Sequence, residues 1–188
     1  MTYVIIIGGT GMLSMASREI AQEVDNALLI ARNPGQLAKN IGARSLQLDW
    51  KDKDTTNAAI HLLENERKAD ILISWVHKDG LWCLQGFENL LIEGGRSIRI
   101  HGSSVGDPSN GVKTDPPARK DINRQNVVLG WKEELGGWRW LTDSEISEST
   151  LLAFRNPKLT SIMAGKVGQP PNTAAFEASA SNLPSFKL

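Results

Sequence analysis

The feature that most constrains the fold is a glycine-rich corner near the start of the chain. Residues 4–7 read Val-Ile-Ile-Ile, a β-branched run typical of a strand buried on both faces of a parallel sheet. Gly8, Gly9 and Gly11 follow at once, and from Met12 to residue 24 apolar residues recur at helical spacing. A strand, a glycine turn and a helix in this order predict the first half of a βαβ unit.

The same alternation of strand and helix continues for about a hundred residues. We expect strands over residues 27–31, 43–48, 70–76 and 97–101, and helices over residues 33–40, 54–67 and 81–92. Asn33 is expected to cap the second helix ahead of Pro34, and Gly94 with Gly95 to close the helix over residues 81–92. The pattern predicts an α/β fold, a doubly wound, three-layer, Rossmann-like parallel sheet in a single domain.

The sequence after residue 101 is less regular. Residues 102–117 are rich in Gly, Ser, Asp and Pro, which predicts a long loop that covers a site. Residues 127–131 and 138–141 predict a strand, a turn and a strand. Thr142 and Glu145 have the spacing of a capping box, which opens a helix to about residue 154, and residues 160–163 predict a last strand. We therefore expect one domain over residues 1–165 and an extended, flexible or partner-exchanged tail over residues 166–188.

Composition excludes several classes of function. The 188 residues contain 21 Lys plus Arg and 21 Asp plus Glu, so no surplus positive charge favours binding to nucleic acid or anionic membrane. Apolar runs are too short to span a bilayer. A single cysteine, Cys83, excludes an intramolecular disulfide and a thiolate-rich metal site, and no ligand spacing indicates another metal site. Because residues 1–3 run into a strand without a secretory signal, we expect a cytoplasmic protein.

The glycine corner has the pattern Gly9-x-Gly11-x-x-Ser14 between a strand and a helix. Glycine permits a tight turn and lets a diphosphate approach the backbone and the helix N-terminus, which favours a dinucleotide site over a bare turn. Arg32 follows the second strand, where an acidic residue would contact a ribose 2′-hydroxyl. A guanidinium there favours a 2′-phosphate, hence NADP(H) over NAD(H), unless Arg32 is simply a solvated side chain.

Further polar residues follow the third, fourth and fifth strands, whose carboxyl ends should meet at the ligand crevice. Asp49 could accept a hydrogen bond from adenine or cap a helix. His77 could donate a proton or simply be hydrogen-bonded at a strand end, and His101 is better explained as a core residue. The six tryptophans could line an aromatic substrate pocket or serve in packing.

The run from Tyr3 to Leu13 resembles the start of short-chain dehydrogenase/reductase proteins, including their atypical and NmrA-like relatives. Residues 31–33, 48–49 and 102–104 follow in the order of that superfamily, and the resemblance covers residues 1–105. It implies an NAD(P) cofactor and redox chemistry on a carbonyl or alcohol. By position, it implies cofactor contacts at Gly8, Gly9, Thr10, Gly11, Met12, Leu13, Arg32, Asn33, Asp49, Trp50, Ser74, Trp75 and Val76. Ser103 or Ser104 would polarise the substrate carbonyl.

One departure from this family bears on function. The usual proton relay is a Tyr-x-x-x-Lys helix after the fifth strand, but the sole tyrosine here is Tyr3. Lys120 and residues 123–126 occupy the approximate region, so His77, Ser104 or water would have to supply the proton. Two hypotheses remain: a small NADP(H)-dependent oxidoreductase, or an inactive nucleotide-binding sensor. Either would bind a small molecule, and residues 127–141 could form a contact between copies of the chain.

Overall fold

The computed structural model describes residues 1–103, 119–135, 137–168 and 170. Strands and helices alternate along the chain, as the sequence predicts. In chain order the elements are β1 (Tyr3–Ile7), α1 (Ser14–Glu23), β2 (Asn26–Ala31), α2 (Gly35–Ile41), β3 (Arg44–Gln47), α3 (Lys53–Glu64), β4 (Ala69–Trp75), the 3₁₀ helix η1 (Lys78–Cys83), α4 (Leu84–Glu88), β5 (Leu91–His101), β6 (Asn123–Leu129), β7 (Trp131–Glu134), β8 (Gly137–Trp140), α5 (Asp143–Arg155) and β9 (Ser161–Ala164).

Seven of the described strands form one parallel sheet in the order β3-β2-β1-β4-β5-β6-β9. The chain first winds outward from β1 to β3 and then returns to the other side of β1 with β4. The direction of winding therefore reverses between β1 and β4. In sheets of this kind the crevice beyond the carboxyl ends of such a strand pair is where ligands bind.

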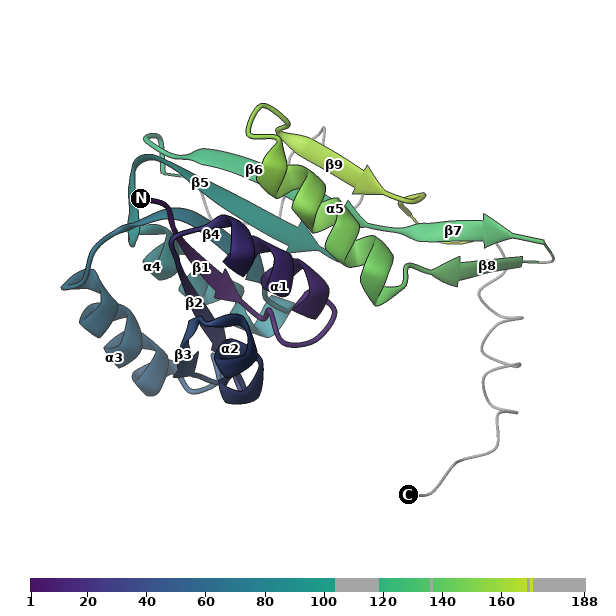
Figure 1. Ribbon diagram of the computed structural model, residues 1–188. Helices are drawn as coiled ribbons and strands as arrows, with labels where there is room; N and C mark the ends of the chain where they lie inside the picture. Colours follow the sequence, from purple (N-terminus) through teal and green to yellow (C-terminus); the bar gives the residue numbers. More distant parts are fainter. Residues whose placement is uncertain (104–118, 136, 169, 171–188) are drawn as a thin grey trace, which may run out of the picture.

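Helices cover both faces of the sheet (Figure 1). One apolar core lies between the sheet and α1, α2 and α5, and a second lies between the sheet and α3 and α4. β1 is buried along its whole length because its successive side chains enter the two cores in turn. The predicted three-layer, doubly wound α/β fold is confirmed.

A two-stranded antiparallel hairpin, β7 and β8, projects beyond the sheet (Figure 1). It carries Trp131, Trp138 and Trp140, whose rings contact one another edge to face. The sequence predicts a strand, a turn and a strand here, but it is wrong to place residues 127–129 in the hairpin. They belong to β6, and Gly130 separates β6 from β7. This position needs glycine because a Cβ there would lie 2.1 Å from the Lys166 carbonyl oxygen.

The predicted helix over residues 81–92 is wrong in its second half. The 3₁₀ helix η1 and the short α4 end at Glu88, and Leu91 already pairs with Ala69 in the sheet. Gly94 closes no helix: its φ of +74° and its hydrogen bond to Asp121 allow an interruption inside β5. A short apolar run such as residues 90–92 fits a strand as well as a helix, so periodicity alone misassigns it.

The remaining boundaries agree with the sequence to within a few residues. The capping box of Thr142 and Glu145 is confirmed at the start of α5. Asn33 does not cap α2, which begins at Gly35 after Pro34. Residues 123–126, the approximate place of a relay helix, lie in β6. Most of the predicted loop over residues 102–117 and most of the predicted tail lie outside the described residues.

Membrane-spanning helices and metal-binding clusters are both absent from the described residues. None of their helices combines the length and the apolar character that crossing a bilayer requires. The described residues contain no cluster of three or more His, Cys, Asp or Glu side chains that could hold a metal ion.

Candidate functional site

A cavity of about 370 Å³ lies beyond the carboxyl ends of β1, β2 and β4, at the crevice that the topology predicts. It brings together nine of the predicted site residues and adds Ala31, which belongs to the family resemblance but is not among the predicted contacts. The lining residues are Gly8, Thr10, Gly11, Met12, Ala31, Arg32, Asn33, Trp50, Trp75 and His77.

The glycine corner shapes one wall of this cavity. Gly8 has a φ of +75°, and a Cβ there would lie 2.3 Å from the carbonyl oxygen of Trp75, so no other residue fits without a backbone shift. A Cβ on Gly9 would collide with Ser17, whose hydroxyl donates to the Gly9 carbonyl. Gly11 is different, since a Cβ there would meet open space. Gly8 and Gly9 therefore serve close packing, whereas Gly11 leaves room above the corner.

The backbone at this corner offers hydrogen-bond donors to the cavity. Within the described part of the chain, the N–H groups of Thr10, Gly11 and Met12 donate to no acceptor. α1 begins directly after them, and no described side chain caps its N-terminus. Unpaired N–H groups at the positive end of a helix dipole attract an anion. The corner can therefore hold a phosphate group.

Arg32 is exposed at the end of β2, on the rim of the same cavity. It makes no ion pair or hydrogen bond with any residue that the structure describes. No carboxylate is among the described residues that line the cavity. A guanidinium free of a protein partner can take a second phosphate in bidentate fashion.

Three rings close the cavity on its other sides. Trp50 follows β3 and is 8% exposed. Its indole packs directly on Gly80, because a Cβ on Gly80 would lie 2.4 Å from the indole ring. Trp75 ends β4, and its indole contacts the His77 ring edge to face, with 5.5 Å between the ring centroids. Aromatic faces of this kind suit a purine or another flat ring. Gly80, which the motifs do not reveal, sets how close Trp50 lies to η1.

Other predicted site residues do not line the cavity. Leu13 and Val76 are buried in the two cores, and Gly9 lies behind the corner. Asp49 accepts a hydrogen bond from the Lys51 N–H in a local turn. Ser74 is buried, and its hydroxyl has no partner among the described residues.

The end of β5 contributes no described residue to the cavity either. Ser103 is partly exposed there, and Ser104 lies outside the described residues. His101 is buried and its Nε2 lies 3.0 Å from Oδ1 of Asn126, which agrees with the interpretation as a core residue.

The single tyrosine lies at the opposite end of the sheet. Tyr3 opens β1, five residues before Gly8, which at the rise of a strand is about 17 Å. Burial raises the pKa of its phenol, while Arg44 opposes that shift. Tyr3 therefore cannot serve as a proton donor at the cavity.

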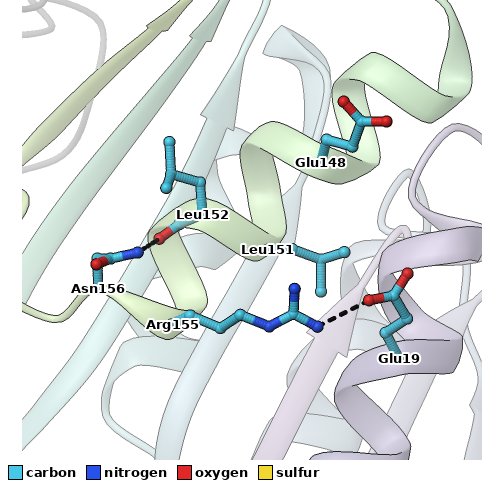
Figure 2. Close-up of a pocket in the computed structure, with 6 residues that line it drawn as sticks. All are labelled: Glu19, Glu148, Leu151, Leu152, Arg155 and Asn156. Carbon is cyan, nitrogen blue, oxygen red and sulfur yellow. Dashed lines mark hydrogen bonds and ion pairs between the residues drawn. The ribbon is translucent and has the colours of Figure 1, made fainter.

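A second depression, of about 270 Å³, lies on the outer surface between α1 and α5 (Figure 2). Its one lining arginine is already paired: Arg155 contacts Glu19 at 2.7 Å and also contacts Glu23 outside the lining. Asn156 donates to the Leu152 carbonyl, as Figure 2 shows. The depression shares no lining residue with the cavity at the glycine corner and contains no described arginine or histidine without a partner.

The chain was compared with known proteins. No family model and no curated protein matches it. Among solved structures it resembles a bulky-bulky ketone specific alcohol dehydrogenase from Comamonas testosteroni, with a TM-score of 0.64, 14% identity, and coverage of 100% of this chain and 97% of that one. A short-chain dehydrogenase from Sphingobium yanoikuyae in complex with NADPH is also similar, with a TM-score of 0.57 and 14% identity. The match covers 100% of this chain and 98% of that one.

A third similar structure is BdcA in complex with NADPH, with a TM-score of 0.59, 14% identity, and coverage of 89% of this chain and 96% of that one. A second structure of BdcA, from E. coli, also resembles the chain, at 16% identity and a TM-score of 0.56. At identities this low the likeness concerns the fold. The chain therefore has the Rossmann fold of short-chain dehydrogenases/reductases.

Proposed function

We propose that the chain binds NADP(H) in the cavity at the glycine corner and acts as an oxidoreductase of atypical short-chain dehydrogenase type. The observation that carries the proposal is a glycine corner open to a cavity, with an arginine at the rim that has no partner among the described residues. The unpaired N–H groups of residues 10–12 suit the diphosphate, and Arg32 suits the 2′-phosphate. Two of the similar structures are complexes with NADPH, which supports the same ligand.

The residues present fit this cofactor. A Cβ at Gly11 would meet open space, so the corner leaves room where a diphosphate needs close approach. Trp50 supplies a flat wall near Arg32, which suits adenine. When bound, the nicotinamide supplies hydride transfer, and the protein's task is to orient it. The substrate class we propose is a small carbonyl compound or alcohol, and the similarity to an alcohol dehydrogenase supports it.

A second candidate function is a nucleotide sensor without catalysis. The observation in its favour is the position of Tyr3, at the opposite end of the sheet from the cavity. General acid catalysis contributes roughly 10²- to 10⁴-fold in rate, and the described residues place no tyrosine where it could act. Binding without turnover is what this candidate predicts.

Titration calorimetry with NADPH and NADH tests the binding site. Arg32→Gln should weaken NADPH binding by about tenfold or more and leave NADH binding within about twofold, because only NADPH carries the 2′-phosphate. Lys39→Gln, which removes an exposed positive charge from α2, is the matched control and should change neither affinity. Equal losses for both nucleotides in Arg32→Gln would contradict the assignment of Arg32.

Turnover separates the two candidate functions. NADPH consumption would be followed with a panel of aldehydes, quinones and imines. Oxidation of NADPH with any of them supports the oxidoreductase, whereas tight binding with no turnover on the whole panel favours the sensor. If NADPH does not bind at all, both candidates fail.

A further inference from the structure

We propose that His77 is a phosphate-binding residue, so that His77 and Arg32 together recognise two separate phosphate groups of one nucleotide. The inference deepens the proposed function, on which it rests, by assigning a ligand contact to a residue that the sequence suggests as a proton donor. The ligand class is a nucleotide phosphorylated at both its 2′ and its 5′ position.

The sheet register places His77 at the glycine corner. β4 lies directly beside β1, and Ser74 is opposite Ile7. The next residue, Trp75, has its carbonyl oxygen where a Cβ on Gly8 would be. Two residues later, His77 lines the same cavity as Thr10 and Gly11. It therefore lines the cavity of the proposed phosphate groups, to which no described residue of β5 or β6 contributes.

The His77 side chain is available to a ligand. It is exposed, and within the described residues neither ring nitrogen makes a hydrogen bond or ion pair. Its ring is held by the edge-to-face contact with Trp75, and its carbonyl accepts a hydrogen bond from the Gly80 N–H. A ring that packs against Trp75 and has both nitrogens free of described partners loses limited conformational freedom on binding an anion.

The charges around the cavity favour an anion at this position. Arg32 and His77 are the ionisable side chains among the described lining residues, and both are basic. Acidic groups on neighbouring elements are already engaged: Asp79 of η1 lies 3.5 Å from Lys51, and Asp49 accepts from the Lys51 N–H. Lys78 begins η1 beside His77. A phosphate next to His77 would therefore meet donors and no unpaired carboxylate among these groups.

Two phosphate positions follow from this arrangement. Arg32 stands at the end of β2 and His77 after β4, on either side of β1 and its glycine corner. One nucleotide lying across the corner would present its 2′-phosphate to Arg32 and its 5′-phosphate or diphosphate to His77 and the N–H groups of residues 10–12. The two basic residues thus recognise different parts of the ligand.

A series of shortened ligands tests this division. Adenosine 2′-monophosphate, adenosine 2′,5′-bisphosphate and NADPH would be titrated into the wild type, His77→Gln and Arg32→Gln by calorimetry. His77→Gln should weaken the bisphosphate and NADPH by about five- to tenfold and leave the 2′-monophosphate within twofold. Arg32→Gln should weaken all three ligands. His61→Gln, which alters an exposed histidine on α3, is the matched control and should change none of them.

The other outcomes each decide against the proposal. An equal loss for the 2′-monophosphate and the bisphosphate in His77→Gln would indicate a general distortion of the cavity and overturn it, as would no loss for any ligand. Unchanged NADPH affinity with a lost rate of turnover would identify His77 as a proton donor instead. If none of the three ligands binds the wild type, the proposed function itself fails. This outcome is distinguishable from failure of the His77 assignment because it is seen in the wild type alone.

Discussion

Two regions of the sheet use their arginines in opposite ways. At the carboxyl ends of β1, β2 and β4, Arg32 is exposed on a cavity and has no partner in the described residues. Behind β5 and β6, Arg99 and Arg124 converge on the carboxylate of Glu88, which is fully buried and also accepts a hydrogen bond from Ser97. The first region leaves its cation for a ligand, and the second pairs its cations with a buried carboxylate.

The difference shows how to distinguish binding residues from structural ones in a chain of this kind. A charge buried with a hydrogen-bonded partner holds elements together, and removing one member leaves an uncompensated charge. A charge on a cavity rim without a partner contributes little to stability and much to recognition. Changes in the two regions should therefore separate stability from nucleotide affinity.

The largest expected loss of stability is in the buried cluster around Glu88. Glu88→Gln removes the negative charge that faces Arg99 and Arg124, and it should lower the free energy of unfolding by about 3–5 kcal/mol. Urea denaturation measures this, with the exposed Glu93→Gln as control. NADPH affinity at a temperature where the variant is folded should stay within twofold, and a large drop there would break the separation of the two regions.

A smaller loss of stability is expected at the glycine corner, together with a loss of binding. Gly8→Ala forces a residue with a Cβ into a φ of +75° and against the Trp75 backbone, which should cost about 1–3 kcal/mol. Because the corner must shift, NADPH binding should fall below detection. Gly11→Ala meets open space, so its stability should equal that of the wild type. A Gly8→Ala variant as stable as Gly11→Ala would refute the description of the corner.

One hydrogen bond connects α5 to the turn that precedes α1. Ser147 of α5 is buried and donates to the Met12 carbonyl, 3.0 Å away, at the cavity wall. Ser147→Ala leaves that carbonyl without its partner and should cost about 1 kcal/mol in thermal or urea unfolding. Ser144→Ala, on the same helix but bonded to Glu148, is the comparison and should have a smaller effect.

The smallest expected effect is the pH dependence that comes from Cys83. Burial raises the pKa of its thiol from 9.0 to about 11, so the folded state keeps its proton where the unfolded chain loses it. The resulting stability is complete below pH 9 and is lost as the pH rises toward 11, with a loss below about 1 kcal/mol near pH 9.5. Urea midpoints at about pH 8 and pH 9.5 should differ by more in the wild type than in Cys83→Ala.

The first half of the fold follows from the sequence because local signals agree there. β1, β2 and β4 are β-branched or leucine-rich runs bounded by turn residues, and the glycine corner between β1 and α1 has one structural interpretation. The cavity follows as well, since parallel strands bring their carboxyl ends to one edge. Nine predicted residues line it for that reason alone.

The second half does not follow from local signals. β6 begins with Asn-Arg-Gln-Asn, which has no strand preference, and it is a strand because β5 and β9 pair with it on both sides. The partners of Glu88 in the buried cluster lie 9 to 36 positions away in the sequence, and no periodic pattern predicts these contacts. Likewise, the packing of Gly80 on Trp50 requires knowledge of where η1 lies. Tertiary contacts decide these features.

The hydrogen bond between α5 and Met12 has a consequence for how the protein is made. Every described residue that lines the cavity belongs to the first 77 of the chain, yet the helix that supports one wall ends at Arg155. A ribosome releases the chain from its N-terminus, so a nascent segment halted after β4 has the glycine corner but not its support. The proposed nucleotide site therefore gains this support only after α5 has been synthesised.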